Sequence, residues 1–327
     1  MRLWAHLNYT KLAEDIARGD RKSAARLISL VEDEEEGCSD AMKLLYERAK
    51  GVPVLGITGP PGVGKSTLVL EIAKRMRSEG KKLGIVAVDP TSPITGGAIL
   101  GDRIRMTELF ADPGVFIRSM GSRGGSGGLS SQTGSVVRIL DALGCDTIIV
   151  ETVGAGQTQV DIMGMADTIV VVTMPGSGDE VQSIKAGLLE IADVYVINKS
   201  DLTGAMRTVS DIKSMLDLVD DWHGWKPPVL QTNAREGKGV GELLDSIQRH
   251  NTFASDSEHL ASRKKEQLKR ELRELVSREV TSRLFEYMSK EELDELLHRM
   301  LNHQTSPYSE AERITSALLR KKHTAAR

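Results

Sequence analysis

The feature that most constrains the fold is an alternation of short apolar strands and amphipathic helices between about Val52 and His250. Several of the strand runs are rich in β-branched residues, as is typical of strands buried on both faces of a parallel sheet. The candidate strands read VPVLGITG, KLGIVAVDP, VFIRSM, DTIIVETVG, TIVVVTMP, VYVINKSD and PVLQTNA. Strands that alternate with helices need right-handed crossovers, and ligands then bind at the carboxyl ends of the strands. We therefore expect an α/β fold with a mostly parallel central sheet flanked by helices.

The first candidate strand leads into a phosphate-binding motif. The stretch GPPGVGKS fits the pattern G-x-x-x-x-G-K-[ST] and opens a helix, which is the context that this motif requires. Its glycines let backbone N–H groups close around phosphates, and the start of the helix adds its positive end. Lys65 would bridge the terminal phosphates, and the Ser66 hydroxyl would ligate Mg²⁺. The loop before them consists of Gly59, Pro60, Pro61, Gly62, Val63 and Gly64. The motif predicts a P-loop NTPase.

Acidic residues near strand ends are the expected metal and water ligands. Asp89 ends the run GIVAVDP, Glu151 ends TIIVE, and Asp102 lies in ILGDRIRM after the second candidate strand. A carboxylate at such a position can hold Mg²⁺ directly or through its waters. Any one of them taken alone would more simply cap a helix or form a turn. Either Asp89 or Glu151 could orient the attacking water.

A second motif indicates the base. The segment VINKSD fits N-K-x-D and follows an apolar strand. Asp201 can accept two hydrogen bonds from the N1–H and the amine of guanine, whereas adenine would leave this carboxylate unpaired. Asn198 would bind the base edge or brace the P-loop, and the Lys199 stem would cover the base face. In the turn QTNAREGKG, which holds Asn233, the backbone N–H of Ala234 could meet the guanine O6. The expected nucleotide is GTP.

Helical zones flank the central domain. Residues 1–50 are charged and helical in pattern, residues 51–252 form the expected GTPase domain, and residues 253–327 lose the strand pattern. In the last zone, one helix face carries Leu268, Leu272, Leu275, Val276, Val280 and Leu284. Helices as charged as these need a surface to pack on, which is either the central domain or a second copy of the chain.

Composition excludes several classes of function. A formal charge of -3 over 327 residues gives no general attraction to nucleic acid or to anionic lipid. The longest apolar runs are far shorter than the roughly 18 residues of a membrane span, and the start of the chain has no signal-peptide core. Cys38 and Cys145 lack metal-ligand spacing, so we expect reduced thiols. These features favour a soluble cytoplasmic protein.

With these motifs in place, the chain resembles the MeaB/ArgK family of GTPases, which includes MMAA-like proteins. The resemblance runs from the N-terminal helices to the C-terminal tail. It is most specific in GITGPPGVGKST, AVDPTSP, GGAILGDRIRM, VETVGAGQ, MPGSGDEVQSIKAG and NKSD. Together these motifs separate the chain from Ras-like GTPases, which have D-x-x-G where ETVG stands here. They also separate it from the GTPases of the signal recognition particle, which belong to the same broader class.

The resemblance implies a function that composition could not. Members of the family are chaperones of adenosylcobalamin-dependent acyl-CoA mutases, typically methylmalonyl-CoA mutase. Binding and hydrolysis of GTP gate the loading of the cofactor and protect or rescue the mutase. Adenosylcobalamin is thus reached only through the partner mutase. The family also dimerises through its C-terminal helices, which implies a homodimer.

The resemblance also assigns roles to residues. By this resemblance, the residues that bind the phosphates and Mg²⁺ are Lys65, Ser66 and Thr67. The acidic residues around Mg²⁺ and its water are Asp89, Asp102 and Glu151. The residues that bind guanine are Asn198, Lys199 and Asp201. The stretch PGSGDEVQSIKAG matches a switch loop characteristic of the family. Lys185 on it would reach the phosphates when the mutase is bound, which implies a GTPase that is slow alone and accelerated by its partner.

Three alternatives remain at this point. One is an NTPase linked to amino-acid transport, although Asp201 argues against ATP. Another is a metal-insertion GTPase of the nickel-chaperone type, although the seven histidines are scattered and no C-x-x-C is present. The third is an interaction module whose bound nucleotide is purely structural.

Overall fold

The computed structural model describes residues 8–35, 37–89, 106–121, 131–152, 162–176, 191–256, 258–286 and 288–324. The chain divides into two compact units, Met1–Gln267 and Leu268–Arg327.

The first unit is built around a seven-stranded sheet in the order β3-β2-β4-β1-β5-β6-β7. Every neighbouring pair is parallel. The strands are β1 (Val54–Thr58), β2 (Leu83–Asp89), β3 (Val115–Gly121), β4 (Thr147–Thr152), β5 (Thr168–Thr173), β6 (Val194–Ile197) and β7 (Val229–Gln231). Each coincides with one of the seven runs expected from the sequence. The predicted α/β class with a parallel central sheet is confirmed.

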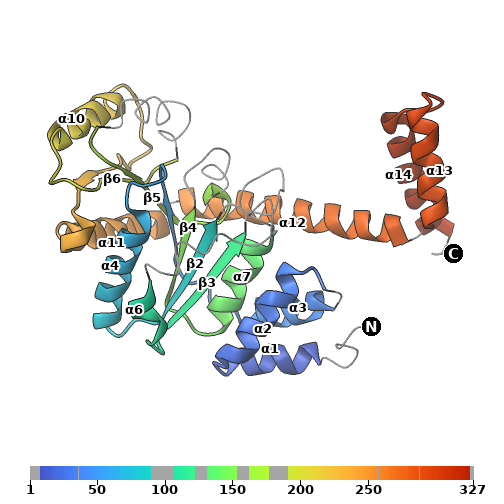
Figure 1. Ribbon diagram of the computed structural model, residues 1–327, viewed down its shortest axis with the longest axis horizontal. Helices are drawn as coiled ribbons and strands as arrows, with labels where there is room; N and C mark the ends of the chain where they lie inside the picture. The colour runs from blue at the N-terminus through green and yellow to red at the C-terminus, as the bar shows by residue number, and fades with distance from the viewer. Residues whose placement is uncertain are drawn as a thin grey trace. The chain divides into compact units, whose positions relative to one another are not determined.

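Helices cover both faces of the sheet, which explains why the central strands are apolar on both sides (Figure 1). On one face, α4 (Lys65–Ser78) and α11 (Val240–Asp256) pack through side chains such as Leu68, Ile72 and Leu243. On the other face lie α7 (Ser131–Ala142) and α10 (Ala205–Leu216). The shorter elements are α6 (Thr107–Phe110) and the 3-10 turns Ile162–Gly164 and Ala234–Glu236.

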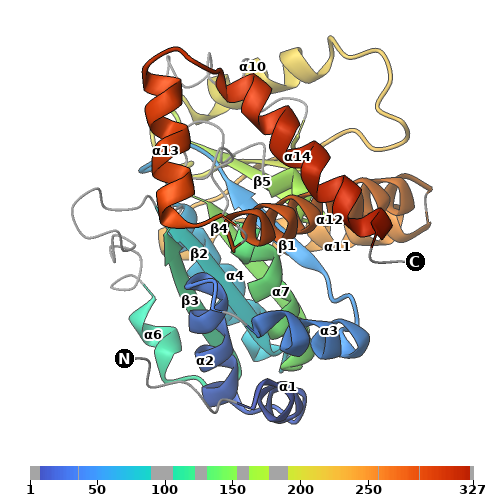
Figure 2. The same cartoon turned by 90° about the vertical axis from the view of Figure 1, so that its right-hand side faces the viewer.

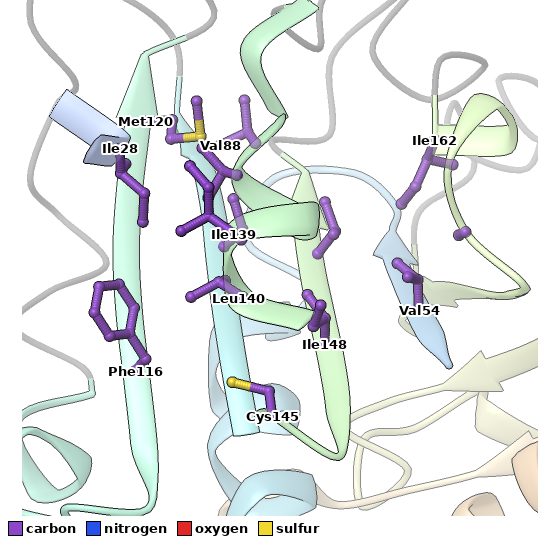
Figure 3. Packing of buried hydrophobic residues seen from close by; sticks show 14 of the residues in the cluster. Ile28, Val54, Val88, Phe116, Met120, Ile139, Leu140, Cys145, Ile148 and Ile162 are labelled. Carbon is purple, nitrogen blue, oxygen red and sulfur yellow. The ribbon is translucent and has the colours of Figure 1, made fainter. Parts of the chain in front are cut away.

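The layer under α7 is closely packed. Figure 3 shows Ile139 and Leu140 projecting from α7 over the strands that carry Val88, Phe116 and Ile148. Burying an aliphatic side chain of this size stabilises the fold by about 1.5–3 kcal/mol. Cys145 lies in the same layer as a free thiol, and burial raises its pKa to about 12.

Three N-terminal helices extend this layer: α1 (Tyr9–Ala17), α2 (Arg21–Glu32) and α3 (Cys38–Arg48). They lie together beside α7 (Figure 2), and each of them contacts α7. Arg21 donates to the carbonyls of Pro113 and Val115 at the start of β3, and Arg118 on β3 forms an ion pair with Glu32. The N-terminal helices therefore belong to the same packed unit as the sheet.

At the edge where the strands begin, three aspartates make the same kind of hydrogen bond to a neighbouring strand. Each stands just before a strand and accepts a hydrogen bond from a backbone N–H at the start of the neighbouring strand. Asp146 before β4 accepts from Lys82 (2.7 Å), Asp167 before β5 from Val54 (2.9 Å), and Asp193 before β6 from Ile169 (2.7 Å). These carboxylates satisfy N–H groups that the sheet itself leaves unpaired.

Asp193 is also the centre of a buried ionic network. Its carboxylate lies 3.3 Å from Nε2 of His250 and 3.1 Å from Arg263, and the Trp225 indole donates to its backbone carbonyl. The Nδ1 atom of His250 lies 2.7 Å from the Thr168 hydroxyl. Burial alone would raise the pKa of Asp193, but the His250 hydrogen bond and the Arg263 charge outweigh it and lower that pKa.

Helix α12 (Glu258–Glu286) begins in the first unit, where its residues Arg263 and Lys264 pair with Asp193 and Asp167. The second unit contains the rest of α12 with α13 (Lys290–Leu301) and α14 (Pro307–Thr324). A capping box between Ser289 and Glu292 starts α13. Nowhere in the described ranges does a helix combine the length and the apolar character that spanning a membrane requires.

Candidate functional site

The phosphate-binding motif occupies the turn between β1 and α4 at the carboxyl edge of the sheet. Two of its glycines are required by their surroundings. A Cβ at Gly59 would stand 2.0 Å from the carbonyl oxygen of Val172, and a Cβ at Gly64 would stand 2.5 Å from Nδ2 of Asn198. Both also have positive φ, at 142° and 94°. The loop can therefore press against β5 and against the guanine motif only with glycine at these positions.

Lys65 begins α4 and turns back over the loop. Its Nζ donates to the carbonyls of Gly59 (2.8 Å) and Pro60 (2.9 Å), and only 7 % of the residue is exposed. Its ammonium group thus lies above the loop, beside the N-terminal end of α4, where backbone N–H groups also favour an anion. This arrangement can neutralise the charge of bound phosphates.

Ser66 and Glu151 bring α4 and β4 together. The Ser66 hydroxyl donates to Oε1 of Glu151 at 2.7 Å, and both residues are only 3 % exposed. A hydroxyl and a carboxylate are oxygen donors of the kind that Mg²⁺ prefers, and Mg²⁺ usually takes its other ligands from water and phosphates. No group of three or more metal-ligating His, Cys, Asp or Glu side chains occurs among the described residues. The two residues fit a magnesium ion held at a nucleotide.

The other predicted acidic residues are placed only in part. Asp89 ends β2, which pairs with β4, and it lies two residues beyond Ala87, the register partner of Glu151. Its backbone therefore stands at the same edge of the sheet. Asp102 and Lys185 lie outside the described residues, as does most of the stretch from Pro175 to Gly187.

The guanine motif follows β6 and is joined to the P-loop. Of the two roles expected for Asn198, the structure contains the brace: its Nδ2 donates to the Val63 carbonyl at 2.9 Å. Its Oδ1 accepts from the Thr232 hydroxyl and from the backbone N–H of Ala234, both at 3.0 Å. The Ala234 N–H expected to meet guanine O6 is thus already bonded to Asn198, so a contact with the base would have to share it.

The adjoining residues complete the guanine side of the site. Lys199 has a positive φ of 54°, and its Nζ donates to the Gly62 carbonyl at 2.8 Å and to Sδ of Met174 at 3.4 Å. Asp201 is exposed. Nearby, hydrogen bonding to Glu236 raises the pKa of Lys238, and the charge of Asp201 adds to this effect.

The turn after β7 is closed by its own backbone. The N–H of Asn233 donates to the Lys238 carbonyl, and the N–H of Lys238 donates back to the Asn233 carbonyl. Asn233 itself is buried, with 7 % of the residue exposed. The motif residues from β1, β4, β6 and β7 are thereby gathered at one edge of the sheet.

Sequence reasoning overlooked a set of threonines at the same edge. Thr58, Thr152 and Thr173 end β1, β4 and β5, and all three are fully buried. The Thr152 hydroxyl donates to that of Thr58 at 2.9 Å, which ties the strand before the P-loop to the strand that carries Glu151. The signal was legible, since GIT, VET and VVT each close an apolar run with threonine.

Comparison with known proteins shows what the whole chain is similar to. A family profile described as "Methylmalonyl Co-A mutase-associated GTPase MeaB" matches residues 24–289. A putative GTPase of Pyrococcus abyssi is 46 % identical over 94 % of this chain and 96 % of its own length. The mouse mitochondrial protein named methylmalonic aciduria type A homolog is 31 % identical over 94 % of this chain and 79 % of its length. Among solved structures, one described as an LAO/AO transport system kinase superposes with a TM-score of 0.69 at 26 % identity, over 96 % of this chain and 100 % of that one.

Proposed function

Because the chain belongs to the family of methylmalonyl-CoA mutase-associated GTPases, we propose that it binds and hydrolyses GTP as a chaperone of an adenosylcobalamin-dependent acyl-CoA mutase. In this role, hydrolysis gates the loading of the cofactor into the mutase and protects the mutase from inactivation. The main observation that supports this proposal is that Lys65, the Ser66–Glu151 pair and Asn198 lie together at one edge of the sheet.

Each part of the site has a task in phosphoryl transfer, which depends on positioning and on neutralising charge. Lys65 and the N–H groups at the start of α4 hold the terminal phosphates. Ser66 and Glu151, with Asp89 and Asp102, hold the magnesium ion, which supplies charge neutralisation at the phosphate oxygens. Asp201 selects guanine, since its carboxylate finds two donors on guanine and none on adenine.

The client and the rate are further parts of the proposal. The mouse relative's name refers to methylmalonic aciduria, and the family description names methylmalonyl-CoA mutase. Both support a mutase of that class as the partner. We expect slow turnover by the chain alone and faster turnover with the mutase bound, with Lys185 brought to the phosphates.

The C-terminal helices are the proposed dimerisation arm. On α12, the side chains of Leu268, Leu272, Leu275, Val276 and Val280 are between 43 % and 63 % exposed. They recur at the spacing of one helix face, and an apolar face of this kind is best covered by the same face of a second copy. Leu272→Glu should yield monomers in sedimentation experiments. The matched control Leu218→Glu, at an 80 % exposed leucine after α10, should leave the oligomeric state unchanged.

The test of the function is GTP turnover, with ATP as the control nucleotide, alone and with each candidate cobalamin-dependent mutase. We expect weak hydrolysis of GTP only, raised many-fold by one mutase, and lost in Lys65→Ala with or without it. Hydrolysis of GTP that no mutase changes would contradict the chaperone role while leaving the GTPase intact. Hydrolysis of ATP at the same rate as GTP would contradict the assignment of the base.

A further inference from the structure

One buried polar group at the carboxyl edge of the sheet, the Thr173 hydroxyl, has no hydrogen-bond partner among the described residues. The Thr173 side chain is 0 % exposed, and its hydroxyl makes no hydrogen bond within the described part of the chain. Leaving a buried hydroxyl unsatisfied costs free energy, and valine would fill the same volume without that cost. The three preceding residues, Val170–Val172, are all valine. Packing alone therefore does not explain a threonine at this position.

The neighbouring threonines are a natural control for this observation. Side chains alternate along a strand, so Thr58, Thr152 and Thr173 all point to the face that carries Val150 and Val171. Thr58 and Thr152 stand side by side on β1 and β4 and bond to each other. Thr173 stands on the opposite neighbour of β1, two residues beyond Val171, the register partner of Thr58. The same residue type on the same face is satisfied in one pair and unsatisfied here.

The surroundings of Thr173 place it beside the P-loop and the base motif. The residue before it touches the P-loop, because the Val172 carbonyl is the atom that a Cβ at Gly59 would strike. Its own carbonyl accepts from the backbone N–H of Asn198 at 2.8 Å. The residue after it, Met174, accepts from Lys199, whose Nζ also bonds the Gly62 carbonyl of the loop. The end of β5 thus contacts both halves of the nucleotide site.

We propose that Thr173 is a positioning residue whose hydroxyl gains its hydrogen bond when magnesium and GTP bind. The partner has the chemistry of the phosphate site: a phosphate oxygen, a water that hydrates it, or a backbone group drawn in by it. This inference rests on the proposed binding of GTP and extends it. The unsatisfied hydroxyl makes the ligand-free protein less stable than it could be, and the bound nucleotide recovers that free energy as affinity. Thr173 would in this way make the end of β5 respond to the nucleotide.

The experiment compares Thr173→Val, which removes the hydroxyl at constant volume, with Thr173→Ser, which keeps it. The thermal midpoint is measured without nucleotide, and dissociation constants are measured for GDP and for a non-hydrolysable GTP analogue with Mg²⁺. We expect Thr173→Val to be at least as stable as the wild type without nucleotide, but to bind the analogue about tenfold more weakly. Thr173→Ser should restore most of the affinity. Thr152→Val, which breaks an existing bond, should instead lose stability with and without nucleotide.

The two nucleotides distinguish which phosphate lies near the partner of the Thr173 hydroxyl. A loss of affinity for the GTP analogue alone places the partner at the γ-phosphate, and an equal loss for GDP places it at the phosphates that the two nucleotides share. A Thr173→Val protein that is less stable without nucleotide and binds as tightly as the wild type would overturn the inference, because the hydroxyl would then have a resident partner such as a trapped water. A wild-type protein that binds no guanine nucleotide would overturn the proposed function, and this inference with it.

Discussion

The two edges of the sheet use buried polar groups in opposite ways. Where the strands begin, Asp193 has its hydrogen bonds and its ion pair inside the protein, from Ile169, His250 and Arg263. Where the strands end, Lys65 bonds the carbonyls of its own loop, and the Thr173 hydroxyl bonds nothing in the described residues. The Asp193 network is satisfied within the fold, whereas Lys65 and Thr173 fit the proposed nucleotide site. Substitution of Asp193 should therefore change stability, and substitution of Glu151 or Thr173 should change nucleotide binding or turnover.

The largest expected effect is a loss of stability at the edge where the strands begin. Asp193→Asn keeps an oxygen for the Ile169 N–H but leaves Arg263 and His250 beside a neutral amide. Removing one member of a buried ionic network costs about 3–5 kcal/mol. Urea denaturation should show a loss of that size, and the folded variant should hydrolyse GTP at the wild-type rate. A loss below about 1 kcal/mol would mean that the network behaves like an exposed ion pair and that the two edges do not differ in this way.

The matching test at the other edge is Glu151→Gln. The amide keeps the size of the side chain and an oxygen for the Ser66 hydroxyl, but it lacks the charge that attracts Mg²⁺. GTP turnover should fall by about a hundredfold, while the free energy of unfolding should change by less than about 1 kcal/mol. Single-turnover hydrolysis and urea denaturation on the same preparation measure the two quantities. A variant that loses stability and keeps turnover would reverse the assignment of this edge.

The sheet was the part of the molecule that sequence could predict best. All seven strand runs and the strand–loop–helix context of the P-loop were legible, because buried parallel strands need continuous apolar runs and the motif needs fixed glycines. The family resemblance carried by six short motifs is likewise confirmed. The order of the strands was not predicted, since it depends on pairings between segments far apart in the chain.

Side-chain partners at the site were harder to predict than the elements that carry them. The motif alone leaves open whether Asn198 binds the base or braces the P-loop. The hydrogen bond of 2.9 Å from its Nδ2 to the Val63 carbonyl of the loop is visible only in the structure. The aspartates before β4, β5 and β6 went unnoticed, although CDT, ADT and ADV each place one directly before an apolar run. Their role needs the neighbouring strand, whose identity depends on the strand order.

A smaller effect, on the stability contributed by Asp193 at the edge where the strands begin, should appear at acid pH. The pKa of Asp193 is lowered in the folded protein, because His250, Arg263 and the Ile169 N–H together outweigh the effect of burial. Its carboxylate therefore contributes its full stabilisation above the unfolded-state pKa of about 3.9, and this contribution is lost as the pH falls through the lower folded-state value. The stability difference between wild type and Asp193→Asn should shrink as the pH is lowered from about 5 to about 2. A difference that stays constant over this range would show that Asp193 does not titrate as a lowered carboxylate.

The smallest effect compares two aspartates, Asp167 and Asp193, at the edge where the strands begin. Asp167 caps the Val54 N–H as Asp193 caps that of Ile169, but its cation, Lys264, is half-exposed and lies 3.5 Å away. Asp167→Asn keeps an acceptor for the N–H and loses only a solvent-screened attraction, so it should cost less than about 1 kcal/mol in urea denaturation. Because both substitutions keep the capping acceptor, an equal cost would mean that the half-exposed pair with Lys264 stabilises the protein as much as the buried network around Asp193 does. If the two differ as expected, the stability of this edge comes from the partners on α11 and α12, because the capping hydrogen bond is common to both aspartates.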